Sequence, residues 1–192
     1  IRYLAYGISM TEWIILVSII YDWKKNLSKD SKTEFTLAYQ FIRLADFWVF
    51  LNIILALLIS IPAINLFTHG THITVAHSMG TTIGINTLIL LSSVTYILES
   101  NHYTLSPKRI QIGIRIFSVS FLLFWLCLLL MGIKKAHWVY FNQALSFAKF
   151  QDAMHWFYML FVLFGLGIFT GLYLIVFELL KNIKKQLAYS SR

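Results

Sequence analysis

A histidine and a methionine lie two residues apart in the segment Thr-Val-Ala-His77-Ser-Met79. On an α-helix, residues with this spacing point about 200° apart, so the two side chains face nearly opposite sides. A neutral imidazole is a strong ligand for iron, and a thioether also ligates heme iron. The spacing therefore fits one helix that holds a heme on each face. On the pattern alone, simpler roles are a histidine that hydrogen-bonds a neighbouring helix and a methionine that packs in the core.

Three further ionisable side chains are candidates for a role in such a site: Glu12, His69 and His72. Glu12 lies inside the first stretch, where a carboxylic acid can relay protons or can join two helices. His69 and His72 lie near the end of the stretch that contains His77, where contact with water accounts for a histidine. His77 lies about two turns deeper, where an ionisable side chain is costly and is a candidate for function.

Five apolar segments must position these residues, at roughly 3–22, 39–64, 72–98, 110–133 and 152–180. A helix of about 20 residues crosses a hydrocarbon core about 30 Å thick, and each segment is that long. Both prolines lie at segment boundaries, where proline is tolerated. Glycines four residues apart predict close helix contacts, in the pairs Gly80/Gly84 and Gly167/Gly171. The sequence therefore predicts an all-α integral membrane helix bundle of five transmembrane helices.

Composition agrees with a membrane protein. The 192 residues are 58% hydrophobic and only 12% charged, whereas a soluble domain carries about 25% charged residues. This balance excludes a soluble enzyme, a secreted disulfide scaffold and a disordered tail. The single cysteine, Cys127, is expected to pack in the core. The net charge of +8 is spread between the apolar segments, which predicts contact with membrane lipid and not with nucleic acid.

The positions of Lys and Arg predict an orientation. Twelve of the 16 lie in the gap 23–43, in 99–115 and in the tail after 180, and four lie on the opposite side. The positive-inside rule places the richer side in the cytoplasm and the N-terminus outside. Since the chain starts at Ile1 without a signal-peptide pattern, we expect it to be the C-terminal part of a larger protein.

The run from Asn65 to His77 resembles the tenth helix of the catalytic subunit of nitric oxide reductase, in the heme–copper oxidase superfamily. About seven of its thirteen positions fit that motif. The resemblance implies that His77 ligates the high-spin, active-site heme. Met79 stands where the family has the histidine that ligates the low-spin heme, so the chain departs from the pattern there. His69 matches a histidine near the heme propionates.

The resemblance extends more weakly along the chain. Glu12 matches a family glutamate near the active-site pocket. The five segments resemble helices eight to twelve of a twelve-helix subunit, so residues 1–192 would form one membrane domain of a larger catalytic subunit. Helix eight of that family runs from outside to inside, which is the direction that the charge count requires.

By this resemblance, the intact protein would reduce nitric oxide to nitrous oxide in a bacterial cytoplasmic membrane. It would use two b-type hemes and a non-heme iron whose ligands lie outside these residues, so the chain alone should be inactive. Electrons would come from cytochrome c or quinol, and the resemblance also implies a cytochrome c-type accessory subunit. The alternatives are an oxygen-reducing cytochrome c oxidase subunit I and, in another class, a non-catalytic helix bundle or transporter part. Few Pro and Gly interruptions at mid-membrane disfavour the transporter.

Overall fold

The computed structural model describes residues 36–101, 103, 105–141, 144 and 146–190, with six single positions before them. This part of the chain is helical and contains no strand. Four helices are long and apolar enough to cross a membrane, which confirms four of the five predicted segments: Thr36–Ser60, His72–Ser100, Pro107–Phe141 and Phe147–Lys184. The segment 3–22, with Glu12, lies almost wholly outside the described residues.

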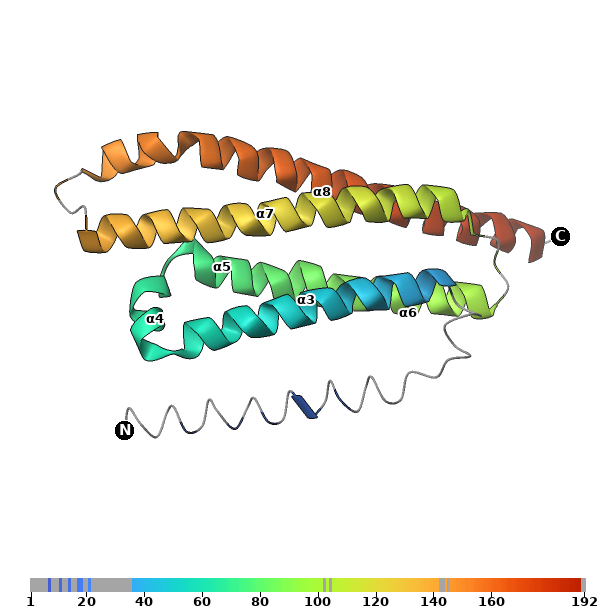
Figure 1. The fold of residues 1–192 in the computed structure, drawn as a ribbon. Coiled ribbons are helices and arrows are strands. Elements are labelled where there is room, and N and C mark those ends of the chain that lie inside the picture. Colours follow the sequence, from blue (N-terminus) through green and yellow to red (C-terminus); the bar gives the residue numbers. More distant parts are fainter. Residues whose placement is uncertain are drawn as a thin grey trace.

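The spans alternate in direction (Figure 1). The first, α3 (Thr36–Ser60), leads through the short α4 (Pro62–Thr68) into a returning span. That span consists of α5 (His72–Met79), the π-helix η1 (Gly80–Asn86) and α6 (Thr87–Ser100). It is followed by α7 (Pro107–Phe141) and α8 (Phe147–Ser190). The start of α3, the α6–α7 connection and the end of α8 therefore share one end of the bundle, as the charge count predicts.

The predicted segment 39–64 is divided in the structure. Proline lacks a backbone N–H and favours the first turn of a helix. Accordingly, α3 ends at Ser60 and Pro62 begins α4. Gly70 then takes a left-handed φ of 70°, and the hydroxyl of Thr71 accepts from the amide of Ile73 at 3.2 Å to cap α5. This tight connection reverses the direction of the chain and leads into the next apolar span.

Helices α7 and α8 pack through glycine. A Cβ added at Gly171 would lie 2.6 Å from the backbone nitrogen of Phe117. At Gly167 it would lie 2.2 Å from the hydroxyl of Ser120, and at Gly113 it would lie 2.9 Å from the carbonyl oxygen of Gly171. The backbones approach each other because no side chain separates them. The predicted close contact at Gly167 and Gly171 is therefore confirmed.

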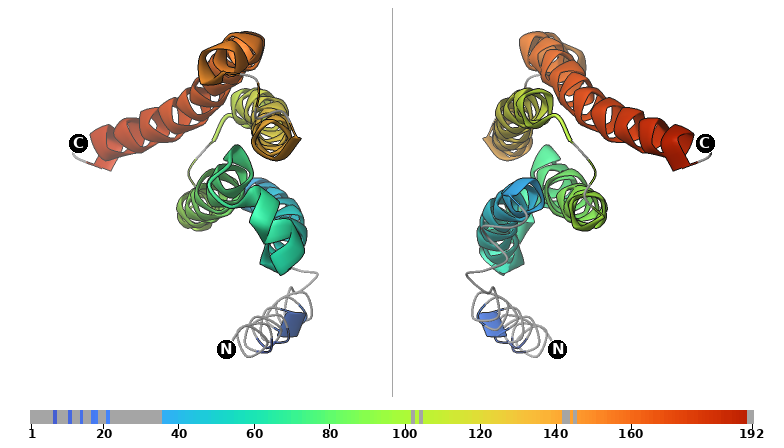
Figure 2. Two further views of the ribbon diagram at one scale, coloured as in Figure 1. Left: turned by 90° about the vertical axis from the view of Figure 1, so that its left-hand side faces the viewer. Right: turned by 90° about the vertical axis from the view of Figure 1, so that its right-hand side faces the viewer.

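In this span α5 packs against α7, while η1 and α6 pack against α3, so the span joins the two helices (Figure 2). Gly80 packs against Asn52, and Gly84 packs against Trp48 of α3 and Phe121 of α7. The rings of Trp48 and Phe121 have centroids 4.2 Å apart. The second predicted glycine pair therefore forms the contact between three helices.

The π-helix keeps one face of this span turned toward the bundle. Buried Ala76, Gly80, Gly84 and Leu88 recur every fourth residue, a spacing that would drift around a regular α-helix of 3.6 residues per turn. A π-helix absorbs the surplus residue. The carbonyl of Thr82 accepts from the backbone N–H of Thr87, five residues on, and also from the Thr87 hydroxyl at 3.0 Å. The π-helix therefore interrupts the regular α-helix of this span, which the sequence did not predict.

Candidate functional site

His77 lies on the last turn of α5, directly before the π-helix. Its side chain is half-buried, and its Nδ1 is buried without a hydrogen-bond partner among the described residues. Its backbone carbonyl accepts from the hydroxyl of Thr81 at 3.3 Å and from the amide of Gly80. The alternative role of this histidine, a hydrogen bond to a neighbouring helix, therefore finds no partner in the described part of the chain.

Met79 lies on the other side of the buried stripe that Ala76 and Gly80 form. At about 100° per residue, His77 and Met79 flank this stripe from opposite sides. Met79 is half-buried and packs against the main apolar core. This contact is what a packing methionine makes, and heme ligation by Met79 stays a prediction.

The other predicted residues lie apart from His77 or outside the described residues. His69 is exposed and caps the C-terminus of α4. His72 begins α5, is half-buried, and also has a buried Nδ1 without a partner among the residues described. Glu12 lies outside the described residues. The structure thus tests the surroundings of His77 but not the role of Glu12.

A buried amide beside His77 was missed by sequence reasoning. Asn52 of α3 is 5% exposed, and its Nδ2 donates to the hydroxyl of Thr81 at 2.6 Å. Its Oδ1 lies against Gly80 and has no hydrogen-bond partner within the described residues. A signal was present, because Asn52 is the one polar residue in the run 47–59. A buried amide oxygen without a hydrogen-bond partner lowers the free energy of unfolding, and such oxygens are rare in folded proteins.

Helix α7 contacts the backbone of α5 near His77, through Trp125 and Gly132. The indole Nε1 of Trp125 donates to the carbonyl oxygen of Ala76 at 3.0 Å, in a buried position. A Cβ at Gly132 would lie 2.6 Å from the backbone nitrogen of Ile73. The backbone on either side of His77 is therefore fixed by contacts with α3 and α7, which sets the direction in which the imidazole leaves the helix.

A second buried ionisable group lies at the other end of the bundle. Glu178 of α8 is 3% exposed and accepts from Nη1 of Arg109 at 3.4 Å. The amide of Asn182 also donates to its carboxylate, at 3.3 Å. The Arg109 side chain is 61% exposed, so this pair ties α8 to the water-facing start of α7. The sequence analysis did not predict this pair, although the sequence shows the Glu178 carboxylate next to an apolar run.

The described residues can be tested for a fit to a metal ion and to a heme. Among the described residues, no three His, Cys, Asp or Glu side chains are grouped to hold a metal ion. A heme needs a single axial residue from a helix, and the unpaired imidazole of His77 meets that need. If His77 held a heme, Nε2 would be the ring nitrogen that ligates iron, since Nδ1 is buried.

No protein-family model, curated protein or solved structure matches the chain.

Proposed function

We propose that the chain is a heme-binding part of a membrane oxidoreductase, with His77 as the axial ligand of its active-site heme. One observation carries the proposal: a half-buried imidazole in a membrane-spanning helix lacks a partner in the described structure. Ionisable side chains inside a membrane are costly and are kept where they act. The motif from Asn65 to His77 supplies the second support, since it names this histidine independently of its contacts.

The surrounding residues have positioning roles in this proposal. Trp125 and Thr81 fix the backbone before and after His77, so the ring keeps one direction. A ligating histidine binds through one nitrogen and donates from the other, so Nδ1 of His77 needs an acceptor from outside the described residues. A bound heme would supply electron transfer and an open iron position for a diatomic substrate.

The reaction follows from the resemblance alone. Nitric oxide reduction to nitrous oxide is the favoured activity, with electrons from cytochrome c or quinol, and oxygen reduction is the alternative. The same resemblance assigns Met79 to the low-spin heme, His69 to the heme propionates and Glu12 to proton relay. The non-heme iron would need histidines from helices outside these residues, since no two of the six histidines are adjacent.

Heme content of the full-length protein tests the central assignment. We expect His77→Ala to lose the high-spin heme, about half of the total, in a pyridine hemochrome assay. The matched control is His72→Ala, because His72 lies on the same helix and also carries an unpaired Nδ1. It should keep both hemes, and both variants should reach the membrane at the level of the unmodified protein.

The outcomes separate the alternatives. Unchanged heme content in His77→Ala would refute the ligand assignment, and no heme in the unmodified protein would favour a non-catalytic bundle. Consumption of nitric oxide or oxygen by the unmodified protein distinguishes the two redox reactions. For Met79, a bis-histidine signature in the near-infrared spectrum would show that another residue ligates the low-spin heme.

A further inference from the structure

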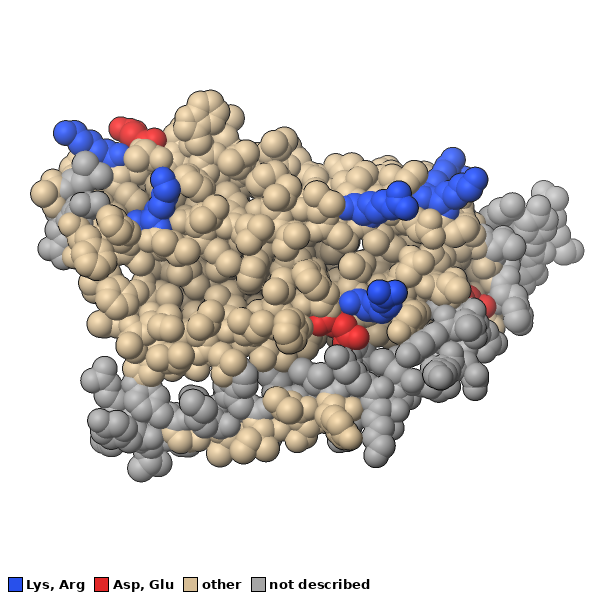
Figure 3. Space-filling view, viewed as in Figure 1, with Lys and Arg blue, Asp and Glu red and all other residues tan. Residues whose placement is uncertain are grey.

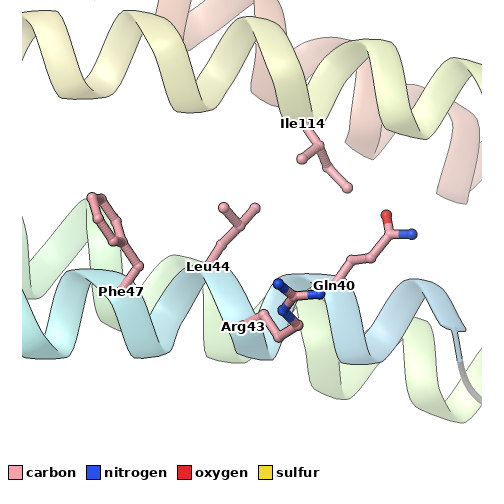
Figure 4. Close-up of a pocket in the computed structure, with 5 residues that line it drawn as sticks. All are labelled: Gln40, Arg43, Leu44, Phe47 and Ile114. Atoms are coloured by element: carbon pink, nitrogen blue, oxygen red, sulfur yellow. The ribbon is translucent and has the colours of Figure 1, made fainter. Parts of the chain in front are cut away.

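A cavity of about 390 Å³ opens between α3 and α7, toward the end where α3 begins (Figure 4). It is lined by two polar and three apolar side chains: Gln40, Arg43, Leu44, Phe47 and Ile114. The polar pair lies on the outer turn of α3, and the apolar residues Leu44 and Phe47 follow one turn deeper. The cavity is therefore polar near the start of α3 and apolar one turn further along the helix.

Arg43 lies near the edge of the uncharged part of α3. The uncharged run 47–59 of α3 begins one turn after it, and the uncharged run 116–133 of α7 begins directly after Arg115. Both arginines are exposed. In the space-filling view, basic side chains near this end and near the opposite end leave an uncharged band between them (Figure 3). Arginine at such a boundary extends toward the lipid headgroups.

Among the described residues at this end of the bundle, basic side chains outnumber carboxylates. Two of these carboxylates have partners that the structure shows: Glu99 accepts from two backbone amides at the start of α3, and Glu178 pairs with Arg109. Asp46, one turn deeper, takes part in an interaction of its own. The remaining basic side chains form no ion pair in the described structure: Arg43, Lys108, Arg115, Lys181 and Lys184.

We propose that this cavity binds an anionic phospholipid. Arg43 would hold the phosphate through paired N–H donors, since its planar guanidinium matches phosphate oxygens. The Gln40 amide would donate to the same headgroup, and one acyl chain would lie over Leu44, Phe47 and Ile114. The positive charge at this end favours an anionic lipid as the ligand. Basic pockets between membrane helices on the cytoplasmic side bind anionic headgroups. The site is independent of His77, which lies toward the other end of the bundle.

Native mass spectrometry of the full-length protein in mild detergent tests the site, with phosphatidylglycerol and phosphatidylcholine of the same chain length as probes. We expect Arg43→Gln to weaken phosphatidylglycerol binding about five-fold, the effect of one basic side chain near a charged lipid. The matched control is Arg115→Gln, which removes the same charge at the same boundary without touching the cavity lining. It should change the affinity less than about two-fold.

Two further arms identify the ligand. Phe47→Ala should weaken phosphatidylglycerol binding while it leaves any binding of inorganic phosphate unchanged, because only the lipid has an acyl chain. Excess inorganic phosphate should not displace the lipid. The proposal is overturned if Arg43→Gln and Arg115→Gln have equal effects, if phosphatidylcholine binds as well as phosphatidylglycerol, or if phosphate alone displaces the lipid. Unchanged melting temperatures would show that the variants are folded.

Discussion

Replacing Gly171 with alanine should force α7 and α8 apart. The new Cβ would lie 2.6 Å from the backbone nitrogen of Phe117 and 2.8 Å from its Cα. Backbone atoms cannot rotate away, so the helices must separate by about 0.8 Å to reach an ordinary contact of 3.4 Å. Overpacking of this kind costs about 1–3 kcal/mol. Alanine also favours the helix by about 1 kcal/mol relative to glycine, which offsets part of that cost.

Gly165→Ala supplies the matched control on the same helix. A Cβ at Gly165 would meet its nearest neighbour, a ring carbon of Phe124, at 4.0 Å. Both variants gain the same helix propensity, so the difference between them isolates the overpacking cost. The melting temperature in detergent, followed by tryptophan fluorescence, should be about 2–12 °C lower for Gly171→Ala than for Gly165→Ala. Equal melting temperatures would refute the close backbone contact.

Three further substitutions test contacts described above. Trp125→Phe removes the hydrogen bond to Ala76 and part of a buried indole, so the free energy of unfolding should fall by at least about 1 kcal/mol in a denaturant titration; no change would contradict that bond. Arg109→Gln should lower the melting temperature more than Glu178→Gln, because it leaves a buried carboxylate without its cation, and the opposite order would contradict the pairing. Glu99→Ala should speed hydrogen exchange in the first turn of α3, measured by mass spectrometry, and unchanged exchange there would exclude the cap.

The spans could be predicted because length and apolar composition alone decide which segments cross a membrane. Three of the four confirmed segments are longer in the structure, because helical hydrogen bonding continues into the polar flanks, whereas 39–64 is divided before Pro62. Pro62 marked a helix boundary correctly, and both glycine pairs lie at helix contacts. These features depend on residue type and local spacing, which a sequence displays directly.

The polar contacts could not be predicted, because their partners are distant in the chain. Asn52 and Thr81 are 29 residues apart, and Arg109 and Glu178 are 69 apart. Nothing local indicates which polar residue meets which. The lack of a partner for the His77 side chain is likewise visible only when the neighbouring helices are in place. Heme ligation by His77 and Met79, and the roles of His69 and Glu12, stay predictions.

The π-helix limits which insertions and deletions the span from α5 to α6 can accept. Residues on either side of it face the same neighbours only while the surplus residue between Gly80 and Asn86 is present. Deletion of one residue there would restore a regular α-helix and turn its two halves by about 100° relative to each other. The half with His77 and the half with Leu88 could then not both keep their contacts with α7 and α3. In homologous proteins, the length of this stretch should therefore vary less than its residue types.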